Sequence, residues 1–540
     1  MNRSERSWRL ASTLALLLSA PLACGDDEGE TNDSEGDSPA VALLAEPKIT
    51  LYPEQPMIVD IELEFPRPTH VTLEHSADPG VRVVPNPDVQ SETHGETSVD
   101  ESTARHYLRV RGLRPETLHR LELTARLDDG TPDVNDAAPL ERAVEFVTPP
   151  ALPDFQPIYE ITRDETAADA IDPSYRAFTM AGVYSTGYHS ATVIDPNGVT
   201  RWHAALPNEG TSPTTIFAGL ALRDDGSLLF TQENRVSIVD ELTRERVGVD
   251  ADELGVALLH HDVIELPGGS LLALGTTFRE LIDPTLDPPA PGLVAGDRLV
   301  EFRMPEAPGL PPELLWSWDA FDHLDTQRVR LGFDQPLADP ISGELALDWT
   351  HANAVVHDPR DDSLLLSLRH QDWILKIDRA SGAILWRLGI EGDFTLEEGA
   401  WFFHQHSPQW QPDGSLLVYD NGCANPYLDD LLERSRAVIY TLDPEAGTAR
   451  VTWSDELDER LSAIAGDADR LPGGNLMVLD SFIVEDFIDG LPQVRSLLRE
   501  LDPARPGAPL WSARLPLNMF LYRATPWTRL PGERGGATSR

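Results

Sequence analysis

The chain has 540 residues and carries 90 acidic against 43 basic residues, which gives a formal net charge of −47 at pH 7. This length exceeds that of one ordinary domain, so we expect two or more domains. Such an acidic protein repels polyanions, which argues against nucleic acid or an anionic membrane surface as partners. We interpret the acidity as a solubilising surface, with adaptation to salt as the alternative.

The first 23 residues have the features of an export signal. Three arginines precede an apolar run from residue 10 to 22, which is too short to span a bilayer comfortably. The run ends at Ala23-Cys24, and a small residue before a cysteine resembles the end of a bacterial lipoprotein signal. We predict a signal peptide over 1–23 and lipidation at Cys24, with plain secretion as the alternative. The protein would then be exported and held in the cell envelope, periplasmic or at the cell surface, and would meet the membrane only through this anchor.

The next part of the chain divides into a tether, a small domain and a linker. Residues 24–44 are acidic, small and turn-rich and cannot bury a core, so we predict a disordered tether. Residues 45–148 alternate apolar and polar positions between turn signals, which predicts a small β-sandwich. Within it, YLRVRGLRPETLHRLELTA (107–125) resembles the fibronectin type III pattern, with His119 where that pattern usually has a corner tyrosine. Residues 149–157 are proline-rich and predict a linker.

The remainder, residues 158–530, is built from repeated phrases. A turn, a small polar residue and apolar strand residues recur as RDDGSLLFT, LPGGSLLAL, PRDDSLLLS, QPDGSLLVYD and LPGGNLMVLD. An aspartate, a turn glycine and a tryptophan follow, as in Asp378-Gly382-Trp386. Units of roughly 40 to 60 residues made of short strands are typical of a β-propeller. We predict an all-β fold with six blades, a strand at 519–527 that closes the ring, and a disordered tail at 531–540. The predicted blades lie near 183–207, 217–247, 258–324, 348–390, 402–456 and 462–517.

Aligning the repeats on their small polar residue brings histidines to one position. This position lies near the start of the strand closest to the propeller axis, which lines the channel. His351 and Asn353 fall slightly earlier in the fourth unit, and Arg369 follows its apolar strand. Three consecutive blades thus point a histidine at one channel, and histidines with an amide and an arginine suit an anionic group. The residues at the aligned position are Ala218, His261, His406 and Gly466.

These residue types also have other uses in proteins. Clustered histidines also bind metals, but an arginine beside them disfavours a cation, so we predict no metal site. His404 faces the same side as His406 and is the weaker candidate for a site residue. We interpret Cys423 as a small buried residue rather than a nucleophile.

Five short motifs make most of residues 158–530 resemble the bacterial arylsulfate sulfotransferases. The resemblance implies a six-bladed propeller that moves a sulfuryl group from a phenolic sulfate ester to another phenol, without a nucleotide sulfate donor. It implies that His406 is the nucleophile. The implied sulfate-binding partners are His261, His351, Asn353 and Arg369. The motifs are HHD (260–262), HAN (351–353), SLRHQDW (367–373), QH (405–406) and YDNG (419–422).

The residue types fit this chemistry. Neutral imidazole avoids repulsion by the anionic sulfuryl oxygens and can form a covalent sulfohistidine, which divides one hard displacement into two easier ones. Arg369 offers a planar fork of donors to two sulfuryl oxygens, and Asn353 adds a neutral donor. His351 or His261, if protonated, donates to the leaving phenolate and later accepts the proton of the incoming phenol. We predict catalytic roles for His406, His351 and Arg369, and substrate binding by His261 and Asn353.

Three other functions remain open for the same channel. A non-catalytic propeller would capture an anionic ligand without turnover, an aryl sulfate hydrolase would use water in place of the phenol, and an interaction scaffold comes last. The sequence has no Gly-x-x-x-x-Gly-Lys loop and no Gly-x-Ser-x-Gly elbow, so we expect no nucleotide and no cofactor. The expected partners are an aryl sulfate donor and a phenolic acceptor, and no nucleic acid.

Overall fold

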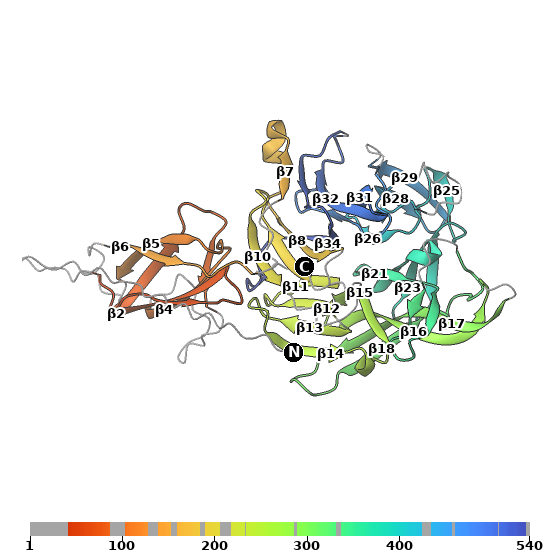
Figure 1. Ribbon diagram of the computed structural model, residues 1–540, viewed down its shortest axis with the longest axis horizontal. Helices are drawn as coiled ribbons and strands as arrows, with labels where there is room; N and C mark the ends of the chain where they lie inside the picture. The colour runs from red at the N-terminus through yellow and green to blue at the C-terminus, as the bar shows by residue number, and fades with distance from the viewer. Residues whose placement is uncertain are drawn as a thin grey trace, which may run out of the picture.

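The predicted all-β class is confirmed: strands joined by turns account for nearly all regular structure in the computed structural model (Figure 1). Helical structure within the described residues is limited to single 3-10 turns, and no helix there is long and apolar enough to cross a bilayer. The 3-10 turns are η2 (Glu165–Ala170), η3 (Asp252–Leu254), η4 (Ala320–Asp322) and η5 (Arg369–Gln371). The structure describes residues 41–86, 103–127, 139–152, 159–183, 189–205, 218–232, 234–285, 289–330, 336–423, 434–455, 460–505 and 507–535.

The two ends of the folded part differ from the predicted boundaries. The signal peptide, Cys24 and most of the predicted tether lie outside the described residues. Val41 is buried in the N-terminal core, although the tether was predicted to run to residue 44. Residues 531–535, expected in a disordered tail, contact the ring, where the Gly532 N–H donates to the Gly226 carbonyl at 2.8 Å. Both ends therefore contribute contacts to the folded part of the chain.

The N-terminal domain is one bent sheet with strand order β3-β4-β2-β5-β6, and β1 pairs with β2. The long strand β2 pairs first with β4 and, after a break in register between Glu64 and Thr69, with β5. Pro66 and Pro68 lie in this break, where the missing N–H groups cost no ladder bond. His119 Nε2 hydrogen-bonds the Arg114 carbonyl upstream at 3.0 Å, as a corner tyrosine would. The strands are β1 (Lys48–Leu51), β2 (Ile58–Glu74), β3 (Arg82–Pro85), β4 (Thr103–Arg111), β5 (Leu118–Leu127) and β6 (Leu140–Val147).

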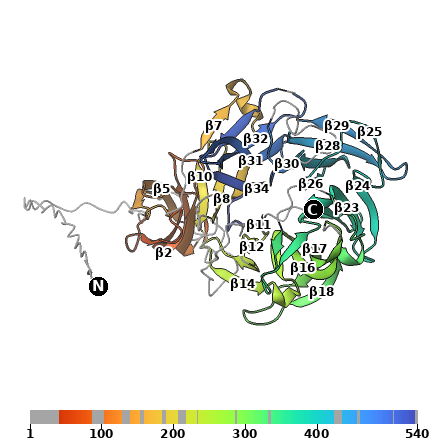
Figure 2. The same cartoon turned by 45° about the vertical axis from the view of Figure 1, so that its right-hand side comes forward.

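Further sheets follow one another around a ring (Figure 2). Their strands are nearly continuous apolar runs because neighbouring sheets cover both faces; in SLLLSL of β22 every residue is buried. One sheet is β11 (Ala218–Leu222), β12 (Leu228–Gln232), β13 (Arg235–Val239) and β14 (Glu245–Asp250). The next is β15 (Leu258–Glu265), β16 (Leu271–Asp283), β17 (Ala290–Arg303), β18 (Glu313–Asp319), β19 (Leu337–Ala338) and β20 (Leu345–Asp348). Then come β21 (Ala352–Asp358), β22 (Ser363–Leu368), β23 (Trp373–Asp378) and β24 (Ile384–Gly389), followed by β25 (Thr395–Glu398), β26 (His406–Trp410), β27 (Leu416–Asp420), β28 (Arg436–Asp443) and β29 (Thr448–Ser454).

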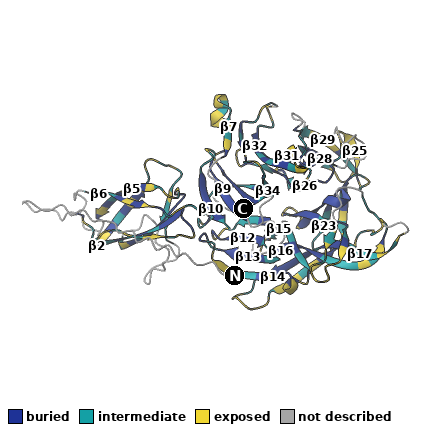
Figure 3. Cartoon of the chain, in the orientation of Figure 1, coloured by how far each residue is buried: buried dark blue, intermediate teal, exposed yellow. Residues whose placement is uncertain are grey.

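The remaining ring sheet joins the two ends of the ring. Its order is β10-β9-β8-β34-β32-β31-β30, with β33 on β32 and β7 on β33. The strand predicted to close the ring, β34, pairs antiparallel with β8 and meets β32 at Arg495↔Met519. Both β8 and β9 are buried along nearly their whole length (Figure 3). The strands are β7 (Glu160–Arg163), β8 (Tyr175–Gly182), β9 (His189–Ile194), β10 (Thr200–Ala205), β30 (Asp467–Arg470), β31 (Leu476–Ile488), β32 (Leu491–Leu501), β33 (Trp511–Arg514) and β34 (Met519–Trp527).

Three of the repeated tryptophans hydrogen-bond a neighbouring unit. The indole N–H of Trp202 donates to the carbonyl of Glu241 in the next sheet at 3.0 Å. Trp318 donates to Gly382 at 3.0 Å in the same way. Trp511, near the end of the chain, donates at 2.8 Å to a carbonyl in the β9–β10 turn. A buried indole needs such a partner, so the phrase of aspartate, glycine and tryptophan sets the contact between units.

Buried charges hold the N-terminal domain against the ring. The Glu241 carboxylate accepts from Arg109 at 2.5 Å and from Arg111 at 2.8 Å, and all three side chains are buried. Arg201 of the ring pairs with Asp78 of the N-terminal sheet at 2.8 Å. Paired charges of this kind fix the register of two surfaces because a shifted arrangement would leave them buried and alone.

We expect the fold to lose stability in acid partly through His203 on β10. Burial lowers the pKa of His203 from 6.5 to about 4, and Thr192 Oγ1 hydrogen-bonds its Nδ1 at 2.9 Å. The unfolded chain therefore binds the proton first, so this contribution is intact above about pH 6.5 and is lost as the pH falls towards 4. We expect the contribution of His203 to the free energy of unfolding to be about 2 kcal/mol smaller at pH 5 than at pH 8. Urea unfolding of wild type and His203→Asn at both pH values checks this, and an equal pH dependence in the two proteins would contradict it.

Candidate active site

A backbone irregularity recurs where the inner strands reach the centre of the ring. The registers of β15, β21 and β26 all shift at this point. His261 (φ 57°), His351 (φ 48°) and Ser407 (φ 46°) adopt left-handed conformations there, which side chains other than glycine rarely adopt. In two other units glycines hold similar places, Gly219 (φ 63°) and Gly466 (φ 114°). Two of the histidines and the residue that follows His406 thus have strained backbone conformations at or beside bulges, and such strain gathers at functional sites.

The bulges bring aromatic nitrogens into one cluster. The ring centroids of His261 and His351 are 4.9 Å apart, and His261 meets Tyr522 edge-on at 5.6 Å. His370, which the sequence analysis did not select, lies 4.5 Å from His351. Burial lowers the pKa of His261 well below 6.5, and the neighbouring histidines lower it further. The cluster therefore favours neutral imidazoles, which can act as nucleophiles and bases.

The hydrogen bonds around His406 define its tautomer. The Asn421 amide nitrogen donates to the carbonyls of Ser462 at 2.6 Å and Ala465 at 2.8 Å, which fixes Asn421 Oδ1 as an acceptor. His406 Nδ1, 2.6 Å from this oxygen, must then carry the proton, and Nε2 keeps its lone pair. Burial lowers the pKa of His406 well below 6.5, and the charge of Arg369 lowers it further. An unprotonated nitrogen beside a guanidinium is suited to attack an anionic electrophile.

Arg369 and Asn353 lie within the same cluster. Arg369 opens η5 directly after β22 and is 4% exposed. It contacts His370 Nε2 at 2.6 Å and the Ala463 carbonyl at 3.4 Å. The Asn353 amide donates to the carbonyl of Gln405 at 2.7 Å. Asn353 therefore ties its own strand to the residue before His406, a contact that the sequence did not predict.

Arg523 on β34 is a second, half-buried cation that sequence reasoning missed. It pairs with Asp262 at 3.0 Å and donates to the Asn353 carbonyl at 3.1 Å. Burial opposes its charge, but Asp262 keeps the pKa of Arg523 above its usual value. A small hollow lined by β8 and β11 reaches Tyr522 and Arg523. An arginine in the apolar phrase MFLYRATPW was the signal in the sequence.

His404 and Cys423 both hydrogen-bond main-chain groups, as expected of the weaker site candidate and of a small buried residue. His404 Nδ1 hydrogen-bonds the Cys423 carbonyl at 3.1 Å, and burial lowers the pKa of His404 to about 2. The Cys423 thiol is buried and donates to the Ala463 carbonyl at 3.4 Å. Both side chains thus bond the backbone.

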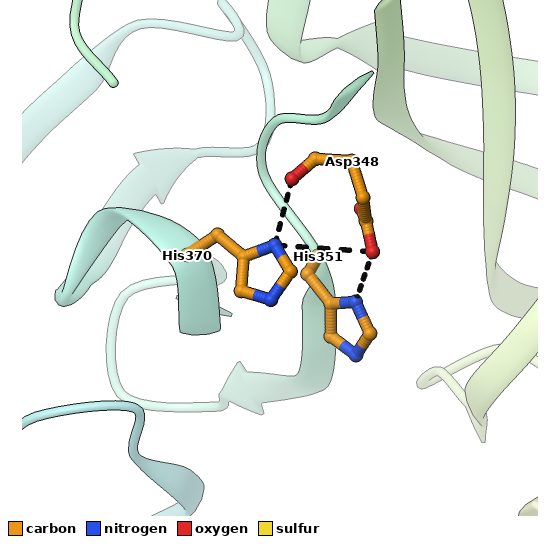
Figure 4. Close-up of side chains that lie close together, drawn as sticks. All are labelled: Asp348, His351 and His370. Atoms are coloured by element: carbon orange, nitrogen blue, oxygen red, sulfur yellow. Dashed lines mark hydrogen bonds and ion pairs between the residues drawn. The ribbon is translucent and has the colours of Figure 1, made fainter. Parts of the chain in front are cut away.

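Three ligating atoms, from Asp348, His351 and His370, lie within 4.8 Å of one another, close enough to hold a metal ion (Figure 4). The hydrogen bonds of His370 oppose that use. Its Nε2 accepts from Arg369, so its Nδ1 carries the proton, which it donates to the Asp348 carbonyl at 2.7 Å. A protonated nitrogen cannot ligate, and the opposite tautomer would set two N–H groups against each other. The donor set therefore favours a hydrogen-bond network over a metal centre.

The fold and the site together define a class: an all-β ring of repeated sheets that brings histidines and arginines into one cluster near its centre. The sequence profile of the family described as Arylsulfotransferase (ASST) matches residues 167–496, more than half of the chain. The chain belongs to this arylsulfotransferase family.

Individual relatives are more distant. The arylsulfate sulfotransferases AssT of Escherichia coli O6:H1 and of Lelliottia amnigena are each 26% identical over 156 residues, which cover 24% of this chain and 26% of theirs. The chain thus matches about a quarter of the length of these curated relatives. Among solved structures, a Bacteroides caccae protein of unknown function has a TM-score of 0.40 at 14% identity, covering 66% of this chain and all of that one. The Pan2 WD40 domain of Neurospora crassa has a TM-score of 0.30 at 8% identity, covering 69% of this chain and 99% of that one.

Proposed function

We propose that this chain is an aryl sulfotransferase that moves a sulfuryl group from a phenolic sulfate ester to a phenol through a sulfohistidine at His406. The observation that carries the proposal is the tautomer of His406. Asn421 holds the proton on Nδ1, and burial beside Arg369 keeps Nε2 unprotonated. A nucleophile held ready in this way has no evident use in a protein that only binds anions.

The reaction divides into two displacements. In the first, His406 Nε2 bonds to sulfur, the sulfur–oxygen ester bond breaks, and the phenolate leaves with a proton from His351 or His261, whichever enters the step as the imidazolium and leaves it as the neutral ring. In the second, the histidine that gave up its proton in the first step takes the proton of the incoming phenol. The phenol oxygen bonds to sulfur as the bond between sulfur and His406 Nε2 breaks. Arg369 donates to the sulfuryl oxygens throughout, and His261 and Asn353 assist in binding them. His406 returns to its starting state, so the chemistry needs no cofactor.

The framework that we propose around this site is a six-bladed propeller over 158–530, preceded by a fibronectin type III-like sandwich over 45–148, whose two layers would be joined where β2 changes partner from β4 to β5. The position of β34 between β8 and β32 supports counting the nine-stranded sheet as two blades. The features of residues 1–24 support export and a lipid anchor at Cys24, which would leave the propeller in the periplasm or at the cell surface.

Initial-rate kinetics with 4-nitrophenyl sulfate and phenol test the proposal. We expect nitrophenol release to rise with phenol and the double-reciprocal lines to be parallel, because donor and acceptor react in separate steps. Intersecting lines would contradict the sulfohistidine. Release that ignores phenol would make the protein a hydrolase, and no release from several aryl sulfates would favour the anion-binding alternative.

A further inference from the structure

Asp348, the last residue of β20, contacts two histidines of the candidate site, His351 and His370 (Figure 4). Its carboxylate lies 2.6 Å from His351 Nδ1. Its main-chain carbonyl accepts from His370 Nδ1 at 2.7 Å, and His370 Nε2 in turn lies 2.6 Å from Arg369 Nη1. One residue thereby reaches a candidate proton donor through its side chain and the anion-binding arginine through its backbone.

The carboxylate determines the tautomer of His351. Burial raises the pKa of Asp348, but the charge and the hydrogen bond of His351 outweigh it and hold that pKa below the ordinary value. An ionised carboxylate only accepts, so His351 carries its proton on Nδ1. Figure 4 shows Nε2 of His351 turned away from Asp348. The negative charge behind the ring also stabilises the imidazolium that forms when Nε2 takes up a proton.

His370 acts on Arg369 in a different way. Burial lowers the pKa of His370 to about 3, so the ring stays neutral. Because Nδ1 donates to the Asp348 carbonyl, Nε2 is left as an acceptor for the guanidinium. This bond holds one edge of Arg369 and restricts the direction in which the fork faces.

We propose that Asp348 is a positioning residue for sulfuryl transfer: its carboxylate holds His351 as the proton donor to the leaving phenolate, and its carbonyl, through His370, orients Arg369. The inference rests on the proposed function. The two contacts of Asp348 would serve different steps, because the carboxylate affects proton transfer and the contact through His370 affects binding of the sulfate donor.

Two donors of different leaving ability test the carboxylate. Phenyl sulfate releases a poor leaving group that needs the proton, whereas 4-nitrophenyl sulfate releases a phenolate that departs readily. We expect Asp348→Asn to lower kcat/KM by about 10²–10³-fold for phenyl sulfate and by less than about tenfold for 4-nitrophenyl sulfate. Asp348→Glu keeps a carboxylate and is expected to recover part of the phenyl sulfate rate.

The matched control is Asp362→Asn. Asp362 also holds a histidine, His357 Nε2 at 2.7 Å, but in the same sheet away from the cluster. We expect Asp362→Asn to leave kcat/KM unchanged for both donors. Equal losses for both donors in Asp348→Asn, or no recovery in Asp348→Glu, would overturn the inference while wild-type turnover still upheld the proposed function. A wild type that turns over neither donor would instead defeat the proposed function.

The second arm is tested with His370→Phe, which keeps a ring and removes both nitrogens. We expect KM for both donors to rise by about tenfold, with the ratio of kcat between the donors unchanged, because Arg369 binds oxygens common to both. His370→Gln restores a donor and an acceptor and is expected to recover part of the affinity. An unchanged KM in His370→Phe would contradict the proposed role of His370. So would a larger loss for phenyl sulfate than for 4-nitrophenyl sulfate, which is the pattern expected of Asp348→Asn.

Discussion

Replacing His406 with alanine is expected to lower phenol-dependent release from 4-nitrophenyl sulfate by at least about 10³-fold. The variant loses the only group proposed to bond to sulfur, while Arg369, His351 and His261 remain to bind the donor. Donor affinity is therefore expected to change little, so the loss falls on kcat. Stopped assays with wild type and variant at saturating phenol measure it directly.

His404→Ala is the control for this result. His404 lies two positions away and is equally buried, but it bonds the Cys423 carbonyl and has no proposed part in the chemistry. We expect it to keep activity within about tenfold of wild type. Mass spectrometry of wild type treated with donor alone is expected to find a sulfated peptide containing residue 406, absent in His406→Ala. A His406→Ala protein as active as His404→Ala would rule out His406 as the nucleophile.

The parts of the fold that follow from local sequence were predictable. The turn before each SLL-type phrase forms the hairpin between the first two strands of a unit, as between Arg223 and Ser227, whose backbone groups bond at 2.8 Å. The tryptophan phrases lie in outer hairpins and contact the next sheet. Both patterns depend on turn chemistry and alternation within some ten residues, which the sequence shows directly.

The candidate site was predictable where it followed the repeat. His261 and His406 were found because the same position holds alanine or glycine in other units. His351 falls slightly earlier than the aligned position in its unit, and the structure shows that it shares the left-handed backbone of His261. A bulge changes the count of residues along a strand, so sequence alignment cannot place it.

The supporting residues depend on contacts between distant segments and were missed for that reason. Asn421 belongs to the YDNG motif, but nothing in the sequence showed that its amide fixes His406 through the backbone of residues 462 and 465. Arg523 reaches the site only because β34 crosses from the end of the chain to β8. No periodicity in the sequence encodes such a crossing. The crossing is what brings Arg523 to its partner Asp262, more than 250 positions earlier in the chain.

Replacing Glu500 with alanine is expected to lower the free energy of unfolding by about 3–5 kcal/mol. Glu500 on β32 is fully buried and accepts from Arg176 on β8 at 2.5 Å. It also accepts from the Asp172 N–H and the Asn475 amide, each at 2.7 Å. The variant leaves Arg176 buried without its counter-charge, and removing one partner costs far more than the pair contributes.

Glu485→Ala provides the comparison, because Glu485 in the same sheet pairs with Arg495 at 3.0 Å while 28% exposed. Water screens that pair, so we expect a loss below about 1 kcal/mol. Urea unfolding followed by tryptophan fluorescence measures both variants, and equal losses would contradict the assignment. The strands of Arg176 and Glu500 flank β34, which carries Tyr522 and Arg523 into the site. Glu500→Ala is therefore also expected to lose activity at a lower urea concentration than Glu485→Ala, because the closure that completes the ring also completes the site.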